Sequence, residues 1–358
     1  MRLFSTEQVS QYHPDKVCDI ISDAVLDACL YQDKNAHVAC ETLFKGTTIV
    51  LAGEITTTAK ITAEEYKSIA RRVAIEHGYD VEDVIVLLRT QSPEIFAGVG
   101  AGEGQGAGDQ GMMFGYACDE TPERLPHGFA MANRIIRTLE GKVGTILNGD
   151  AKCQVTVDLD SDVGLGAIQT VLISACHSNR FDVEEVRRFI KNAIREEHGI
   201  EESERLKLII NPAGAWTLGG PAADCGLTGR KIVCDQYGGY CAVGGGAFSG
   251  KDPSKVDRSA AYMARALACH YLDGIPGMES CLVHIAYAIG QAEPVSVLAK
   301  CQMHDAKWND TYSEKVAADI KKNYDLRPYA IAQTLDLLKP QYEEIARGCH
   351  YRKDYWRV

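Results

Sequence analysis

Three segments of this chain, spread along its whole length, follow the same order of elements: a β-hairpin and then an amphipathic helix. Hairpins are expected at 36–58, 152–175 and 281–301, where β-forming residues alternate around turn-rich centres. Alternation places apolar side chains on one face of a sheet, and the helices can cover that face. We therefore predict an α+β fold of three pseudo-repeated two-layer units, each an antiparallel sheet covered by helices.

The helices after the hairpins carry recognisable start and stop signals. The clearest begins after Asp182, which can form a capping box with Glu185, and ends at Gly199. Short apolar runs at 84–88 and 206–210 predict a strand after each of the first two helices. The start signals after the first and third hairpins are Thr62 with Glu65, and Ser313.

The length of 358 residues exceeds what one ordinary core organises, so several domains are expected. Hydrophobic residues make up 46% of the chain and charged residues 24%, which is the composition of a folded protein rather than a disordered one. We divide the chain, with strands free to be exchanged between repeats, into an N-terminal repeat at 1–97, a glycine-rich mobile lid and connector at 98–111, a central repeat at 112–219 and a C-terminal repeat at 220–358.

Charge and hydropathy argue against two classes of partner. A formal net charge of -11 disfavours nucleic acid, because a polyanion requires clustered cations. No stretch approaches the roughly 18 uninterrupted apolar residues of a membrane-spanning helix, and the N-terminus lacks the apolar core of a signal peptide.

The thirteen cysteines include no Cys-x-x-Cys pair and are odd in number, which favours reduced thiols over disulfides or a zinc site. We expect a cytoplasmic protein.

The first chemically informative motif is Gln-Tyr-His-Pro-Asp-Lys, which precedes an amphipathic helix near the N-terminus. Pro14 favours a helix start and keeps His13 extended, so an imidazole, the Asp15 carboxylate and the Lys16 ammonium gather at a helix N-terminus. This combination suits phosphate plus a metal ion, although an ordinary loop with an acid in the first turn is the alternative. Three further acids at a spacing of four predict a solvated, structural helix face: Asp19, Asp23 and Asp27.

The segment 91–111 has a glycine at every second position from Gly98 to Gly108, which no regular element tolerates cheaply. A phosphate cradle, a linker and a mobile lid are all compatible with this pattern. We favour a lid, because glycines allow the backbone to move while polar side chains can contact a substrate on closure. The lid residues are Gly98, Gly100, Gly102, Gly104, Gly106 and Asp109.

A second glycine-rich segment, 244–257, contains the G-x-x-x-x-G-K part of a phosphate-binding P-loop. It then departs from that motif, since Asp252 replaces the Ser or Thr that holds magnesium and Pro253 has no N–H to donate. Its two lysines and the acid that opens the next helix still suggest phosphate and metal ligands. A solvated charge run is the alternative. The residues concerned are Lys251, Lys255 and Asp257.

Two more clusters combine acids with cations. Asp150 and Lys152 are expected at the mouth of a strand. Arg230 and Lys231 follow a tight glycine turn and precede a strand predicted at 232–237, and adjacent cations there can clamp an anion. A surface hairpin explains the second cluster equally well.

Six motifs together, HPDK, CETLFKG with GEITT, GAGDQG, DAKCQVT, GGPAADCGLTGRK and GGGAFSGKDPSKVDRSAA, resemble the methionine adenosyltransferase (S-adenosylmethionine synthetase) family over nearly the whole chain. The resemblance implies the S-adenosylmethionine synthetase-like fold of three intercalated α+β repeats. It also implies the reaction, in which the methionine sulfur attacks C5′ of ATP and the released triphosphate is hydrolysed to phosphate and pyrophosphate. A thioether has no proton to lose, so this attack requires alignment and cations rather than a general base.

The resemblance also implies residue roles. The catalytic residues would be His13, Lys152, Arg230, Lys231 and Lys251. ATP would be bound by these five together with Asp150, Trp216, Asp224 and Ala247. Methionine would be bound by Glu54, Gln91, Asp224 and Lys255. Two Mg²⁺ ions would be held by Asp15 and Asp257, and one K⁺ ion by Glu41.

The same resemblance implies a homodimer or homotetramer with active sites shared between subunits, and ATP and L-methionine as substrates. Two positions depart from the family pattern near the nucleotide: Val243 stands where many relatives have histidine, and Ala215 where arginine is common. A P-loop-like phosphotransferase and a catalytically silent relative are the two alternative functions.

Overall fold

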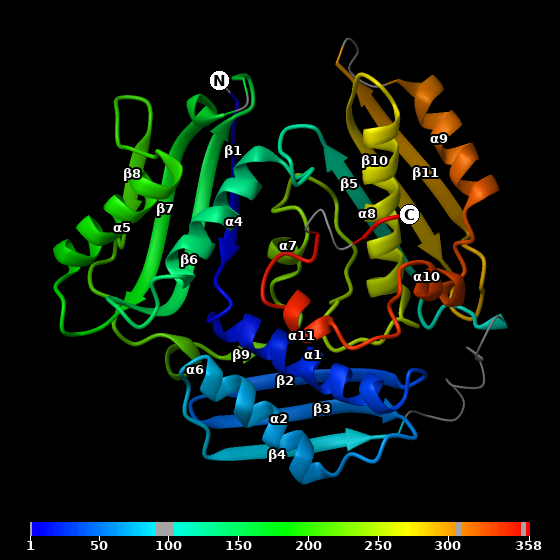
Figure 1. The fold of residues 1–358 in the computed structure, drawn as a ribbon, viewed down its shortest axis with the longest axis horizontal. Coiled ribbons are helices and arrows are strands. Elements are labelled where there is room, and N and C mark those ends of the chain that lie inside the picture. Colours follow the sequence, from blue (N-terminus) through cyan, green and yellow to red (C-terminus); the bar gives the residue numbers. More distant parts are fainter. Residues whose placement is uncertain (1, 91–103, 163, 305–308, 352–355) are drawn as a thin grey trace.

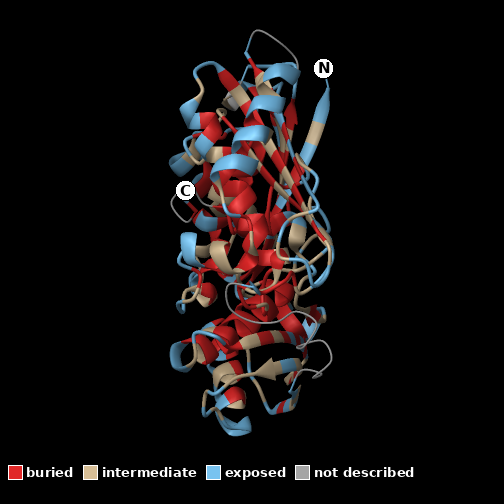
Figure 2. Ribbon diagram, turned by 90° about the vertical axis from the view of Figure 1, so that its right-hand side faces the viewer, coloured by how far each residue is buried: buried red, intermediate tan, exposed pale blue. Residues whose placement is uncertain are grey.

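The computed structural model describes residues 2–90, 104–162, 164–304, 309–351 and 356–358. Three sheets surround the centre of the molecule, and helices lie in front of them in Figure 1. The side view in Figure 2 shows a flat molecule with buried residues running through its middle. The predicted α+β architecture of helices on hairpin-based sheets is confirmed.

The first sheet has the strand order β4-β3-β2-β9. Its hairpin, β2 and β3, is antiparallel, and β4 pairs with β3 in parallel after the helix α2. The short strand β9 comes from much later in the chain and pairs with β2. The bounds are β2 His37–Lys45, β3 Thr48–Thr56, α2 Ala63–Glu76, β4 Asp83–Arg89 and β9 Gly226–Leu227.

The second sheet repeats this plan in the order β1-β6-β7-β8, with an antiparallel hairpin and a parallel strand after a helix. Its remaining strand, β1, comes from the beginning of the chain and pairs with β6. The bounds are β1 Leu3–Val9, α4 His127–Glu140, β6 Leu147–Asp158, the 3-10 turn η2 Leu165–Ala167, β7 Ile168–His177, α5 Val183–His198 and β8 Lys207–Ile210.

The third sheet is antiparallel throughout, in the order β11-β10-β5. Each sheet therefore contains one strand that is distant in sequence from its hairpin. The bounds are β5 Gly111–Cys118, α8 Val256–Gly274, β10 Met278–Tyr287, β11 Ser296–Met303 and α9 Asp310–Asn323. The central helix α1 spans Pro14–Gln32, and the short helices are α6 Gly220–Ala223, α7 Ile232–Asp235, α10 Pro328–Thr334 and α11 Tyr342–Ile345.

Two hydrophobic cores hold these layers together. One joins the first and third sheets through α1, α8 and the C-terminal helices. The other lies between the second sheet and the helices α4 and α5. All thirteen cysteines are free thiols in the structure, and most are buried.

Local sequence signals located most of these elements correctly. Both capping boxes are present, at Thr62 with Glu65 and at Asp182 with Glu185, and Gly199 ends α5 in the left-handed conformation. Two predictions were wrong. The third-repeat helix α9 begins after Asn309 rather than Ser313, because the Asn309 side chain accepts the Tyr312 N–H at 3.1 Å. Residues 232–235 form the helix α7 instead of a strand.

The prediction of a solvated acidic face on α1 was also wrong. Asp19 and Asp23 are fully buried. Asp19 accepts the Gly229 N–H at 2.9 Å, and Asp23 accepts the Gly250 N–H at 2.8 Å. Asp27 accepts the N–H groups of three successive residues, 341–343. These acids are structural because they fix loops from much later in the chain onto α1.

Candidate functional site

The N-terminus of α1 carries a group of polar side chains that we call the α1 cluster: His13, Asp15, Lys152, Arg230 and Lys231. His13 is the N-cap of the helix, with φ -62° and ψ 135°, and its Nδ1 accepts the Asp15 N–H at 3.1 Å. Pro14 occupies the first helical position, as the sequence predicted. The imidazole is therefore fixed at the positive end of a helix dipole, where anions bind favourably.

Asp15 connects the helix to the cationic loop that follows β9. Its carboxylate is fully buried and accepts the Leu227 N–H at 2.9 Å and the Lys231 ammonium at 2.5 Å. The Arg230 Nε lies 3.4 Å from the same carboxylate. Because β9 pairs with β2, the sheet itself brings these two cations to α1.

The charges around His13 determine its protonation state. Burial, reinforced by Lys231 and Lys152, lowers the pKa of His13 to about 3. The imidazole is therefore neutral at physiological pH, while the positive charge of the α1 cluster resides on the neighbouring lysines and arginine.

Asp150 and Lys152 reach the same region from β6. They lie inside this strand rather than at its mouth, because β6 begins at Leu147. One Asp150 oxygen accepts the Gly220 N–H at 2.8 Å, and the other is buried without a partner among the described residues. Burial, with the charges of Asp224 and Asp15, raises the pKa of Asp150 to about 6. The predicted ATP-binding residues Asp150, Lys152 and Asp224 are thus close to His13.

A second group, which we call the α8 cluster, lies where the glycine-rich loop meets α8: Lys251, Lys255 and Asp257. Lys251 Nζ lies 2.6 Å from the Asp257 carboxylate. A Cβ on Gly246 would lie only 2.2 Å from the Asp257 Cγ, so any other residue there would displace this carboxylate. Lys255 Nζ donates to Asp252 at 2.7 Å.

The glycine-rich loop does not have the form of a P-loop. In a P-loop the helix opens at the Gly-Lys pair, whereas α8 begins only at Val256. Asp252 is buried and accepts the Val38 N–H, which ties the loop to β2 instead of to a ligand. This arrangement argues against the phosphotransferase alternative.

The two clusters remain separate within one chain. Across the described residues, no hydrogen bond or ion pair joins a side chain of the α1 cluster to one of the α8 cluster. Their loops are attached to α1 at Asp15 and Asp23, which are eight residues and therefore about 12 Å apart along the helix. The sequence predicted each cluster, but one chain does not bring them together.

Other predicted site residues are dispersed. Glu41 and Glu54 are exposed on β2 and β3. Trp216 is partly exposed in the loop after β8, and its indole N–H donates to the Leu218 carbonyl at 2.7 Å. Ala247 lies close to Gly229, whose Cβ would be 2.6 Å from the Ala247 Cβ. Four of the predicted site residues lie outside the described part of the chain: Gln91, Gly98, Gly100 and Gly102.

The C-terminal end of the predicted lid packs against the turn after β10. Gly106 is buried, and a Cβ there would lie 2.3 Å from the Gly290 carbonyl oxygen. Ala107 exchanges backbone hydrogen bonds with Gly290 and Gln291. Gly104 and Asp109, on either side of this contact, are exposed.

Lys16, which the sequence placed with His13 and Asp15 in the site, lies elsewhere, and its partner Asp235 was not predicted. Lys16 points into the interior, where its Nζ lies 2.6 Å from Asp235 and 3.2 Å from Asp19. It therefore anchors α7 to α1 and leaves His13 and Asp15 to face the site. The spacing of three between Lys16 and Asp19 was the signal available for this pairing.

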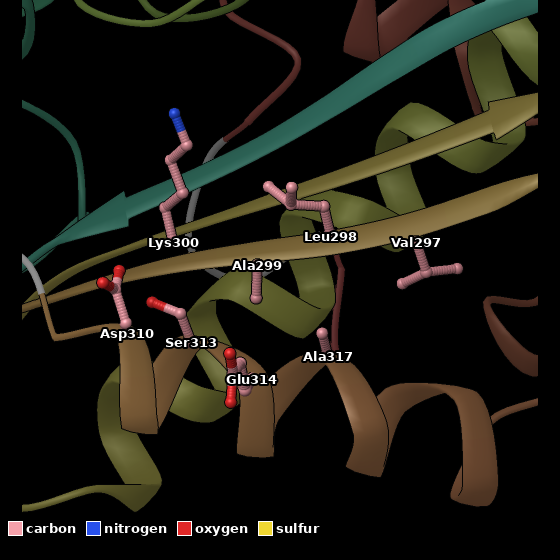
Figure 3. A pocket seen from close by; sticks show the side chains of 8 residues that line it. All are labelled: Val297, Leu298, Ala299, Lys300, Asp310, Ser313, Glu314 and Ala317. Carbon is pink, nitrogen blue, oxygen red and sulfur yellow. The ribbon is translucent and has the colours of Figure 1, made fainter.

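A cavity of about 580 Å³ lies between β11 and α9 and contains none of the predicted site residues. Figure 3 shows Ala299 on the side of β11 that faces α9, and Leu298 and Lys300 on the opposite side. The α1 cluster and the α8 cluster lie elsewhere, at the N-terminal ends of these two helices.

A neutral imidazole among cations at a helix N-terminus, on a fold of three α+β units, is the arrangement expected of an enzyme that handles a phosphorylated substrate. Comparisons with known proteins define the class further. The family models of S-adenosylmethionine synthetase match residues 1–97 for the N-terminal domain, 104–216 for the central domain and 218–357 for the C-terminal domain. The chain belongs to the S-adenosylmethionine synthetase family, and its function is that of a methionine adenosyltransferase.

Two relatives illustrate the similarity. The chain is 43% identical to an S-adenosylmethionine synthase from Brachyspira hyodysenteriae (strain ATCC 49526 / WA1), with 98% of this chain and 93% of the relative covered. It is also similar to the solved structure titled as an unusual S-adenosylmethionine synthetase from Campylobacter jejuni. That match has a TM-score of 0.87 at 32% identity and covers 99% of this chain and 96% of the other. The predicted fold, family and activity are confirmed.

Proposed function

We propose that this enzyme aligns the methionine sulfur with C5′ of ATP, releases the triphosphate as the leaving group, and then hydrolyses it to phosphate and pyrophosphate. The observation that carries the proposal is the α1 cluster, in which cations surround a neutral His13 at a helix N-terminus. The attacking thioether requires no base, so catalysis depends on alignment and on stabilising the departing anion. Loss of one such contact typically costs about 10² to 10³ in kcat.

In this proposal each cation has a phosphate to hold. Lys152, Arg230, Lys231 and Lys251 bind the triphosphate, and neutral His13 donates a hydrogen bond to the departing oxygen. Asp150, Trp216, Asp224 and Ala247 complete the ATP site. Methionine is bound by Glu54, Gln91, Asp224 and Lys255. The lid residues, Gly98, Gly100, Gly102, Gly104, Gly106 and Asp109, cover both substrates.

The acids of the two clusters fit Mg²⁺ as partners of a phosphate-bound ion. Mg²⁺ commonly takes one or two carboxylates together with phosphate oxygens and water. The described residues contain no group of three His, Cys, Asp or Glu placed to hold a metal alone. Asp15 and Asp257 would each bind one Mg²⁺, and exposed Glu41 would bind K⁺. When bound, these ions add positive charge to the triphosphate, while Lys231 and Lys251 keep both aspartates in place.

A second copy of the chain supplies what one copy lacks. The sheet faces that helices leave uncovered expose large apolar side chains, including Leu87 at 54% and Met112 at 58%. Apolar patches of this kind indicate contact surfaces. We propose a homodimer or homotetramer in which the α8 cluster of one subunit faces the α1 cluster of another. Mixing a Lys152→Ala chain with a Lys251→Ala chain should then restore part of the activity that each variant lacks.

The product assay tests the chemistry directly. Incubation with ATP, L-methionine, Mg²⁺ and K⁺ should give a sulfonium product together with phosphate and pyrophosphate, and activity should disappear on chelation of Mg²⁺. Formation of ADP as the only nucleotide product would contradict the proposal and favour a phosphotransferase.

Within the described residues, no helix combines the length and the apolar character that crossing a bilayer would require. We propose a cytoplasmic location.

A further inference from the structure

Another cavity, of about 350 Å³, lies behind the loop that carries Lys251 and Lys255. Three parts of the chain that are distant in sequence form it. They are residues 34–37 at the start of β2, the loop at 252–254 and the segment 328–338. Gln105 completes its wall. The volume is within the usual range for small-molecule pockets. Of the proposed substrate site, only the lid segment reaches the cavity, through Gln105 between Gly104 and Gly106.

Gln105 provides the strongest sign that this cavity takes a ligand. Its side chain is only 7% exposed, and its Nε2 has no hydrogen-bond partner in the described structure. Buried side-chain donors are nearly always paired, so an unpaired one on a cavity wall indicates an acceptor supplied from outside the chain.

The other polar residues that line the cavity are Lys34, Asn35, His37, Asp252 and Ser254, and two of them, Asp252 and Lys34, carry a full charge. The Asp252 carboxylate already accepts the N–H groups of Val38 and Ser254 and the ammonium of Lys255, so its charge is balanced within the chain. Lys34 is exposed at the cavity's edge and adds a positive charge to the free donor of Gln105. A ligand must bring an acceptor oxygen, and a negative charge is favoured.

The rest of the cavity wall is apolar, and it therefore favours a ligand whose uncharged part is also apolar. It consists of Pro253, Pro328, Ala332 and Leu338, with the ring of Tyr329. We propose that this cavity binds a small organic monocarboxylate with an apolar body, its oxygen accepting from Gln105 Nε2 and its charge lying near Lys34. This inference goes beyond the proposed function.

Calorimetric titration of the full chain with phenylacetate, and with uncharged phenylacetamide as its isostere, tests the proposal. Phenylacetate should bind with a Kd below about 1 mM, as expected for a ligand of this size, and the amide at least tenfold more weakly. Saturating L-methionine should leave the Kd unchanged. Displacement by methionine would place the probe at the reaction site and overturn the proposal, as would equal binding of acid and amide.

Two variants separate a ligand-binding role of Gln105 from a structural one. Gln105→Leu should weaken phenylacetate binding at least tenfold, while the melting temperature of the ligand-free protein stays unchanged or rises, because a buried unpaired donor is removed. Gln169→Leu, on β7 of the second sheet, is the matched control and should change neither property. A Gln105→Leu protein that binds phenylacetate normally, or is simply less stable, would rule the site out.

Discussion

The first turn of α1 and the turns that follow it carry aspartates at a regular spacing of four residues, but these acids serve different purposes. At its N-terminus, Asp15 sits beside His13 and draws Lys231 and Arg230 into a polar site. Asp19, Asp23 and Asp27 follow at one, two and three turns, and they accept backbone N–H groups from loops at residues 229, 250 and 341–343. The acids are equivalent in sequence, and only their surroundings distinguish a proposed metal ligand from a structural anchor.

The difference shows how a buried carboxylate acquires its role. The Asp23 oxygens are taken by a backbone N–H group and a buried arginine, which leaves little capacity for a ligand. Asp15 and Asp257 are paired with lysine ammonium groups, and such an acid can exchange its partner for a metal ion or a phosphate-bound cation.

Replacing Asp23 should damage the fold more than any change in the α1 cluster. Its carboxylate lies 2.6 Å from the Arg258 guanidinium, and both side chains are fully buried. Asp23→Ala leaves that cation unpaired, so the free energy of unfolding in urea should fall by about 3–5 kcal/mol. Asp23→Leu combined with Arg258→Met should recover most of this loss. A change below about 1 kcal/mol in the single variant would contradict the anchoring role.

Lys152→Ala should produce the opposite result at the functional end. The lysine is exposed on β6 and makes no ion pair with another described residue, so unfolding stability should stay within about 0.5 kcal/mol. The kcat for S-adenosylmethionine formation should fall about a hundredfold, because a contact to the leaving group is lost. Lys207→Ala, exposed on β8 of the same sheet, is the matched control. Normal turnover in Lys152→Ala would remove this residue from the site.

Asp27, the last of the three structural acids of α1, should make the free energy of unfolding depend measurably on pH. Burial raises the pKa of Asp27 to about 6, from a usual value of 3.8, despite the three N–H donors. The folded state therefore holds this proton more tightly than the unfolded state, so the protonated carboxyl favours folding and the benefit is lost as pH rises through 6. Between pH 7.5 and 5, wild type should gain about 1 kcal/mol relative to Asp27→Asn. A difference independent of pH would disprove the assignment.

The smallest effect is expected at an exposed helix cap. In α2, Thr62 accepts the Glu65 N–H, and the Glu65 carboxylate accepts the Thr62 N–H in return. Thr62→Ala should lower unfolding stability by about 0.5–1 kcal/mol with no effect on kcat. Thr62→Ser retains the hydroxyl and should restore stability. Equal losses in both variants would show that the cap hydrogen bond is not the cause.

The sequence located most elements because their signals are local. Alternating residues marked the three hairpins, and the capping boxes at Thr62 and Asp182 marked two helix starts. The start of α9 was misplaced where two neighbouring polar residues competed, and Asn309 proved to be the cap. Motif reasoning also found His13, Asp15, Arg230 and Lys231, which the structure brings together.

By itself the sequence determined the hairpins, the two capped helices and the residue types of both clusters, since each depends on neighbours a few positions apart. Only the tertiary structure decided that β1, β5 and β9 join sheets distant from them in sequence, that Lys16 turns inward, and that the acids of α1 are buried. The physical reason is that pairing between distant segments depends on which buried donors find which acceptors. No spacing along a single segment records that choice.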